Sequence, residues 1–252
     1  MLLLLGACGG STQVKDDQVA KLPTEDRRSL MDEEQAVRTA EANLDTSRVA
    51  IEEAKKYRSI VDTELDGAKA QHEAAKQAIE LTGEAADQQP ESAARERAQV
   101  EREHLSAFEA KAGYADSLVE LRRTQEGMRK AELDLARAQL EREELNTLRA
   151  RGMGKDLKED EFAKHEREAQ NKFEEARFQV EQVEGQTRHA RETWDEARQQ
   201  YEASARRTGV TDVPIGAPPP REALPTPAAK EMPAKQHEHE QHEHEQHEEP
   251  SE

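Results

Sequence analysis

Histidines gather near the C-terminal end of the chain, in a repeat of Gln-His-Glu-His-Glu that spans residues 236–249. The histidines of this tract are His237, His239, His242, His244 and His247. Imidazole nitrogens bind Zn²⁺, Ni²⁺ and Cu²⁺, and neighbouring carboxylates attract a dication. Because such a tract has no preformed geometry, we expect modest affinity. A solvated low-complexity tail and a pH response, in which histidine gains charge below about pH 6.5, are the alternatives.

A second histidine pattern, Glu101-x-x-His104, has the spacing found in di-iron helical bundles. Such a site needs a second copy and two further inward-facing glutamates. Elsewhere in the helical part the residue at that spacing is not glutamate: Lys69 precedes His72, Phe162 precedes His165 and Gln186 precedes His189. The sequence also has no glycine-rich phosphate loop, nucleophile elbow or zinc-protease motif. We therefore expect a protein that is not an enzyme and needs no cofactor.

The single cysteine, Cys8, follows a short apolar stretch at the start of the sequence. The segment Leu5-Gly6-Ala7-Cys8 resembles the lipobox of bacterial lipoprotein precursors. The resemblance implies that residues 1–7 are a truncated signal peptide and that the Cys8 thiol carries the lipid. Signal peptides usually have a basic start and a longer apolar stretch, so we expect the true start codon upstream. The other interpretation is an ordinary apolar N-terminus with an incidental cysteine.

Residues 8–24 are mostly polar and lack a helical period, which predicts a flexible, lipidated tether. Gly9 follows the cysteine where aspartate would retain a Gram-negative lipoprotein in the inner membrane. The resemblance thus implies a protein of the cell envelope, held by its lipid in the outer membrane and facing the periplasm. Several acyl chains anchor a protein firmly, whereas a single chain does not.

The chain of 252 residues is acidic, with a formal net charge of −18, and only 3% of its residues are aromatic. Basic residues are interspersed with a larger number of acidic ones, so we expect no nucleic-acid partner. Hydrophobic residues make up 34% and charged residues 37%, too little apolar volume for a conventional globule. Long helices with a thin apolar seam need much less.

A seven-residue repeat begins at Leu30 and predicts a helix over residues 25–81. One column of the repeat holds mainly large residues: Leu30, Val37, Leu44, Ile51, Arg58, Leu65, His72 and Ile79. The column three positions later holds mainly small ones: Glu33, Ala40, Ser47, Ala54, Val61, Ala68 and Ala75. We expect Arg58 and His72 to set the register. Thr82-Gly83 and Pro90 predict a loop over residues 82–91.

Two further helices are predicted over residues 92–150 and 156–208. The first has a wider apolar stripe, as a helix packed on two neighbours requires. The Gly152-Met153-Gly154 turn separates them, and Asp156 stands at capping-box spacing before Glu159. The last helix carries its large residues in one column, Phe173, Val180, Thr187, Trp194 and Tyr201, and its small ones in another, Ala169, Ala176, Val183, Ala190, Ala197 and Ser204.

Together these patterns predict an all-α fold: a long antiparallel three-helix coiled coil, an up-down-up rod over residues 25–208, with a disordered N-terminal tether and C-terminal tail. Helices of about 55 residues give a rod on the order of 80 Å long. A proline-rich linker over 209–235 and the low-complexity tail over 236–252 follow. The alternative is that the seams are shared between chains, which would give a homo-oligomer.

Residues 130–183 resemble the helical hairpin of periplasmic membrane fusion (adaptor) proteins, most clearly in the stretch Lys130–Leu140. The β-rich parts of that family are absent. Our first functional hypothesis is a membrane-anchored structural scaffold or spacer that binds envelope proteins through the rod. A metal-binding lipoprotein that uses the histidine tract is the alternative. A periplasmic adaptor or a holdase, similar to helical-tentacle chaperones, is a further one.

Overall fold

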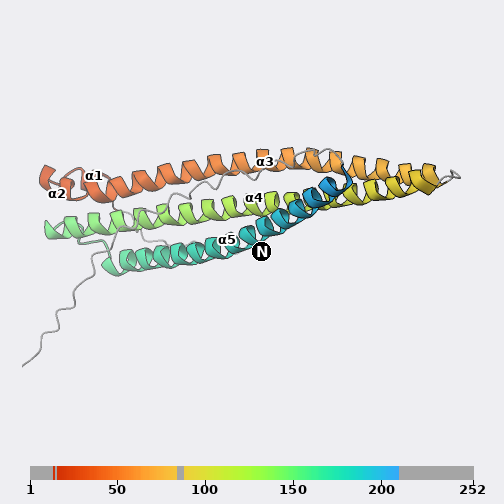
Figure 1. Ribbon diagram of the computed structural model, residues 1–252. Helices are drawn as coiled ribbons and strands as arrows, with labels where there is room; N and C mark the ends of the chain where they lie inside the picture. The colour runs from red at the N-terminus through yellow and green to blue at the C-terminus, as the bar shows by residue number, and fades with distance from the viewer. Residues whose placement is uncertain (1–13, 15, 84–87, 210–252) are drawn as a thin grey trace, which may run out of the picture. The chain divides into compact units, whose positions relative to one another are not determined.

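The computed structural model describes residue 14 and residues 16–83 and 88–209, which contain helices and no strand (Figure 1). The helices are α1 (Asp16–Val19), α2 (Thr24–Ser29), α3 (Met31–Gly83), α4 (Gln88–Ala150) and α5 (Glu159–Thr208). The three long helices α3, α4 and α5 run alternately up, down and up along the bundle. The all-α, antiparallel three-helix prediction is confirmed.

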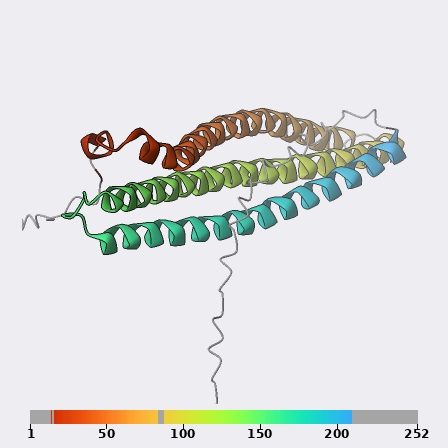
Figure 2. The same ribbon diagram turned by 90° about the vertical axis from the view of Figure 1, so that its left-hand side faces the viewer.

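Helix α4 is the central helix of the bundle, because α3 and α5 both pack along it. Figures 1 and 2 show α4 running between its two neighbours. Its apolar stripe is accordingly wide: Tyr114 and Val119, which belong to different columns of the repeat, are both buried. The prediction that this segment packs on two neighbours is confirmed.

The seam between α3 and α4 consists mainly of small side chains. Buried α3 residues include Ala40, Ala54, Val61, Ala68 and Ala75, all from the column predicted to hold small residues. In the column of large residues Leu44 and Ile51 are buried, while Leu65 and Ile79 are only half-buried. Arg58 and His72 are half-buried as well. Alanines let two helices approach closely, so this seam is narrow and needs little apolar volume.

The helix ends differ from the prediction at four places. Residues 25–29 belong to a separate helix, α2, so that α3 begins at Met31, and α3 ends at Gly83, inside the loop predicted for residues 82–91. Helix α4 begins at Gln88, four residues before the predicted start, so Pro90 lies in its first turn. Proline is tolerated there because the first N–H groups of a helix have no intrahelical acceptor. Helix α5 begins at Glu159, and its N-terminal cap is Lys158, without a side-chain hydrogen bond. The predicted capping box of Asp156 and Glu159 is therefore not formed.

Glycines end the helices where a left-handed backbone is needed. Gly152 and Gly154, in the α4–α5 turn, have φ angles of 73° and 67°. Gly209 caps α5 with a φ of 66°, as predicted from its place after the last helical residue. The basic residues Arg206 and Arg207 lie in the last turn of α5, where the helix dipole favours cations.

The N-terminal segment packs on the bundle beside the α4–α5 turn. Val14 and Leu22 are buried there in an apolar cluster with four other side chains: Leu30, Leu145, Leu148 and Phe162. We call these six residues the turn-end cluster. Residue 14 and residues 16–24 thus differ from the flexible tether predicted for 8–24. The sequence did not predict this packing because Val14 and Leu22 are not part of a helical repeat. Contacts with residues distant in the sequence bury both.

Candidate functional site

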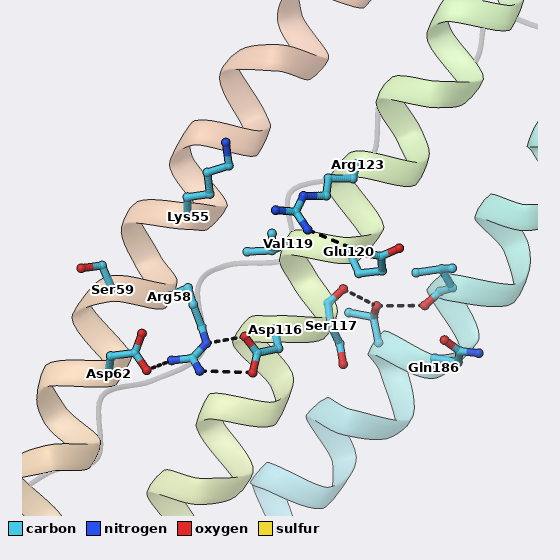
Figure 3. A pocket seen from close by; sticks show the side chains of 12 residues that line it. Lys55, Arg58, Ser59, Asp62, Asp116, Ser117, Val119, Glu120, Arg123 and Gln186 are labelled. Atoms are coloured by element: carbon cyan, nitrogen blue, oxygen red, sulfur yellow. Dashed lines mark hydrogen bonds and ion pairs between the residues drawn. The ribbon is translucent and has the colours of Figure 1, made fainter.

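A groove of about 650 Å³ lies at mid-length on the bundle and is lined by all three long helices (Figure 3). We call it the central groove. Small polar residues create it: Thr187 of α5 and Ser117 of α4 stand where larger apolar side chains would otherwise fill the seam. The Thr187 hydroxyl has two backbone oxygens that can accept its one proton, those of Ser117, at 3.2 Å, and Val183, at 2.9 Å. Either bond satisfies a buried hydroxyl that could not be left unpaired.

Ion pairs form the walls of the central groove. Arg58 of α3 binds Asp62 on its own helix and Asp116 of α4, with Nη2 3.2 Å from the Asp116 Oδ2 atom. The other two cations of the lining are also paired: Lys55 with Glu52 and Arg123 with Glu120. The lining holds three cations and three carboxylates, so the groove has no excess charge with which to attract an ion. Arg58, which we expected to set the register, joins α3 to α4.

A second feature is a layer of buried aromatic and polar side chains between α4 and α5, nearer to the C-terminal end of α5 than the groove. We call it the aromatic layer, and it consists of His104, Phe108, Lys111, Tyr114, Trp194 and Tyr201. Tyr114 stacks on Trp194 with ring centroids 5.5 Å apart. The His104 ring lies 4.9 Å from Phe108, edge to face, and 4.6 Å from Tyr201. Trp194 and Tyr201 were predicted as core residues, and their burial confirms this.

Lys111 is the buried cation of the aromatic layer. Its side chain is only 4% exposed, and its ammonium binds the Glu64 carboxylate of α3. The Nζ atom also lies 5.3 Å from the Phe108 ring centroid and 5.8 Å from that of Trp194. Both distances are in the range of cation–π attraction. The sequence analysis missed Lys111, because a lysine seven residues after a histidine looks like part of a solvated helix face.

Burial changes the protonation chemistry of this layer. It lowers the pKa of His104, although the nearby Glu101 carboxylate partly opposes the effect. Burial also raises the pKa of Tyr57, on the facing side of α3, to about 12. His104 is thus neutral at pH 7. Its Nδ1 atom lies 3.6 Å from Glu101 Oε2, so the Glu-x-x-His spacing does bring the two together.

The part of the chain that the structure describes contains no group of three or more His, Cys, Asp or Glu side chains arranged to hold a metal ion. Glu101 and His104 therefore form a pair within the packed interior. We assign them a packing role, with the imidazole between two aromatic rings.

Carboxylates crowd together near the α4–α5 turn. Burial raises the pKa of Glu144 to about 7, and the negative charges of Glu141, Asp16 and Glu34 add to this effect. His165 of α5 lies 3.4 Å from Glu141, Nδ1 to Oε2, and partly opposes the burial that raises the pKa of Glu141. The N-terminal helix α1 contributes Asp16, so the packing of this segment is coupled to the charge at the end of the bundle.

The residues predicted to carry chemistry lie outside the described residues. This applies to Cys8, the predicted lipid attachment site, and to the five histidines of the tail, the predicted metal ligands. Both assignments stay predictions. Among the helices that the structure describes, none is both long and apolar enough to cross a membrane.

The comparisons with known proteins add no relative to this description. The chain matches no family model, no curated protein and no solved structure.

Proposed function

We propose that this protein is a lipid-anchored protein of the cell envelope that acts as a non-catalytic coiled-coil spacer and scaffold. The supporting observation is where the chain enters and leaves the bundle. Val14 and Leu22 pack beside the α4–α5 turn. Gly209, at the opposite end of α5, lines a groove together with Gln71 and Ala78 of α3. The 50 residues of α5 separate the two points by about 75 Å.

The composition of the interior also favours a mechanical role. Buried positions recur along the length of α3 and α5, and the cations that line the central groove are bound to neighbouring carboxylates. A lipid on Cys8 would hold one end of the bundle at the outer membrane, on its periplasmic face. The C-terminal end of α5 would then lie away from that surface, and the helices of the bundle would bind envelope proteins.

Lipid attachment is tested by metabolic labelling of a bacterium that expresses the protein with an alkyne analogue of palmitate. We expect label on the wild-type protein and none on the Cys8→Ser variant. A matched control, Cys8→Ser combined with Ser11→Cys, keeps a thiol three residues away and should also stay unlabelled. Label on either variant would show that the lipobox resemblance is incidental.

The scaffold role is tested by photo-crosslinking in the same cells. A photoreactive residue is placed at Lys155, in the α4–α5 turn, or at Arg221, in the proline-rich linker. Because Lys155 precedes α5 in the sequence and Arg221 follows its last residue, we expect each to yield its own discrete adduct. Lys69, an exposed residue at mid-length, is the control. If neither terminal position gives more adduct than Lys69, the scaffold proposal fails.

Metal binding by the tail is the second candidate, and the observation in its favour is the five-histidine repeat of residues 236–249. Calorimetry with zinc on the full chain and on a chain that ends at Lys235 separates the two functions. Heat at micromolar zinc that disappears with the deletion would support metal handling. No heat from the full chain would exclude it. If metal handling is the function, cells that express the chain ending at Lys235 should be sensitive to metal and should have no envelope defect.

A further inference from the structure

A further groove lies on the α3–α4 hairpin, toward the C-terminal end of α3. It has a volume of about 340 Å³, and its described lining comes from α3 and α4 alone. We call it the cationic groove, and its described lining residues are His72, Lys76, Ile79, Arg95, Ala98, Gln99 and Arg102. Three of these side chains are cations and one is a histidine, whereas none is a carboxylate.

The sequence places the cationic side chains in two rows, one on each helix. His72 and Lys76 of α3 are four residues apart, and therefore lie on one helix face. Arg95 and Arg102 of α4 are seven residues apart, which also places them on one face. The buried Ala98 lies between these two arginines in the sequence. Because alanine is small, the packed helices leave a groove between the two rows.

Arg102 is the cation of this groove that has no carboxylate partner. Within the described part of the chain it forms no ion pair. The sequence explains this, because the residues three and four positions away on its own helix are all uncharged: Ala98, Gln99, Leu105 and Ser106. Its guanidinium therefore keeps its N–H donors for water or a ligand, in a fork that matches the oxygens of a phosphate.

The other two cations have partners only on their own helices. Lys76 lies 3.4 Å from Glu73, and Arg95 binds Glu91. The Lys76 side chain is 54% exposed and that of Arg95 is 68% exposed. Exposed ion pairs of this kind contribute little to stability. Both side chains can therefore turn toward a ligand of greater charge at small cost.

A one-signed lining is unexpected in this chain. Its 55 acidic residues outnumber its 37 basic ones, so a groove on its surface would ordinarily include carboxylates. The central groove has three cations and three carboxylates. The groove at the end of α5 has Glu101 beside Arg97. Of these three grooves, the cationic groove is the one with a positive charge that its own lining does not balance.

We propose that the cationic groove binds the phosphate group of a ligand. Phosphate carries nearly two negative charges at neutral pH, which balances the lining better than a single carboxylate would. Its oxygens would accept hydrogen bonds from the Arg95 and Arg102 guanidinium groups and from the Lys76 ammonium group. The groove is at the small end of the range for ligand pockets, which suits one such group. This site does not depend on the lipid anchor or on the spacer role.

His72 would supply a further donor. Its Nδ1 atom is buried and has no hydrogen-bond partner within the described part of the chain. The tautomer of a neutral imidazole is set by the bond that one of its nitrogens makes. Because no such bond fixes the proton on Nδ1, the Nε2 atom can carry it and donate it to a phosphate oxygen.

The test is a titration of the full chain, as the soluble Cys8→Ser variant, with inorganic phosphate at constant pH and ionic strength. The readout is the imidazole NMR signal of His72, which is identified by its loss in His72→Gln. We expect this signal to shift at millimolar phosphate. The signal of His189, an exposed residue of α5, should stay in place. No shift of the His72 signal would overturn the proposal.

A matched pair of variants tests the role of Arg102. Arg102→Gln should weaken phosphate binding, read from the His72 signal, by at least ~10-fold, because a charge-assisted hydrogen bond is lost. Arg177→Gln removes the same charge from an exposed position of α5 and should leave the affinity unchanged. Both substitutions keep a good helix former, so the fold is retained. Equal affinities in the two variants would show that phosphate binds elsewhere.

Acetate tests the choice of phosphate over a carboxylate. We expect acetate to bind at least ~10-fold more weakly than phosphate, because it brings one charge and two oxygens. Equal binding of the two anions would overturn the assignment to phosphate.

Vesicles distinguish a free phosphate from a lipid headgroup. The same soluble protein is sedimented with vesicles of phosphatidylglycerol and phosphatidylcholine, and with vesicles of phosphatidylcholine alone. Sedimentation that requires phosphatidylglycerol, and is lost in Arg102→Gln but kept in Arg177→Gln, would assign the phosphate to a lipid headgroup. A His72 response to phosphate without vesicle binding would assign it to a soluble ligand. The absence of both would overturn the proposal.

Discussion

The turn-end cluster and the aromatic layer stabilise the same bundle with opposite chemistry. The turn-end cluster is wholly apolar and joins the N-terminal segment, including Leu30 at the end of α2, to α4 and α5. The aromatic layer contains a neutral imidazole and a buried ammonium among its rings. The turn-end cluster forms from residues that are far apart in the sequence. The aromatic layer forms from residues at heptad positions of packed helices. The difference teaches that a regular coiled coil can bury a charged group if a neighbouring helix supplies its partner, as Glu64 of α3 does for Lys111.

Replacing Trp194 with alanine should have the largest effect on stability. Trp194 is fully buried and contacts both Tyr114 and Lys111, so its loss leaves a cavity at the centre of the aromatic layer. We expect the free energy of unfolding to fall by about 3–5 kcal/mol, measured by urea denaturation. The control Phe178→Ala removes an aromatic residue of α5 that is 59% exposed, and should change it by less than about 0.5 kcal/mol. Similar losses in both would show that the layer is not a specific core.

Leu148→Ala tests the turn-end cluster in the same way. Leu148 is fully buried against the N-terminal segment, and we expect a loss of about 3 kcal/mol. Leu81→Ala, at an exposed position of α3, is the control. Limited proteolysis should also cut residues 14–24 faster in Leu148→Ala, because the cluster is what holds this segment. Unchanged cleavage would mean that the segment is held by other contacts.

Removing Glu64 or Lys111, which form an ion pair at the aromatic layer, should lower the free energy of unfolding by different amounts. Glu64→Gln removes the negative charge beside a buried ammonium, and should cost about 1–3 kcal/mol. Lys111→Met should change stability by less than about 1 kcal/mol, because Glu64 is 36% exposed and water can solvate it. Equal costs in urea denaturation would indicate that the lysine is needed for more than its charge.

The two glycines of the α4–α5 turn provide a matched pair. Both have positive φ, so alanine at either position should cost about 1 kcal/mol. A Cβ atom at Gly154 would also lie 3.4 Å from the Leu148 Cβ atom, whereas at Gly152 it would meet nothing. Gly154→Ala should therefore lower the melting temperature further than Gly152→Ala. The reverse order in calorimetry would place the turn-end cluster away from Gly154.

The smallest effect should be the pH dependence of the turn end. Burial and nearby carboxylates raise the pKa of Glu144 from its ordinary value of 4.5 to about 7. The folded state therefore holds this proton more tightly than the unfolded state. The stability that this contributes is fully present below pH 4.5 and is lost as the pH rises through about 7.

Glu144→Gln should consequently raise the melting temperature at pH 8 by a few degrees and change it little at pH 5. Glu175→Gln, at an exposed position of α5, should have no such pH-dependent effect. A melting temperature lowered at pH 8 by Glu144→Gln would mean that the charged carboxylate stabilises the turn end.

The heptad pattern of the sequence predicts which side chains are buried where burial follows the helical repeat. Val180, Thr187, Trp194 and Tyr201 all belong to one predicted column of α5 and are all buried. The start of α4 was predicted too late because proline was taken to block a helix that in fact begins two residues before it. Lys111 was missed because its burial depends on Glu64, which is remote in the sequence.

The contact between α2 and the α4–α5 turn has a mechanical consequence. Arg151 binds Asp26 through two hydrogen bonds, of 2.6 and 2.7 Å. Paired bonds of this kind resist displacement in more than one direction. Tension that enters from the N-terminal side is therefore shared between α2 and the loop that joins the other two helices. A force applied to the chain before α2 therefore acts on the α4–α5 turn as well as on the start of α3.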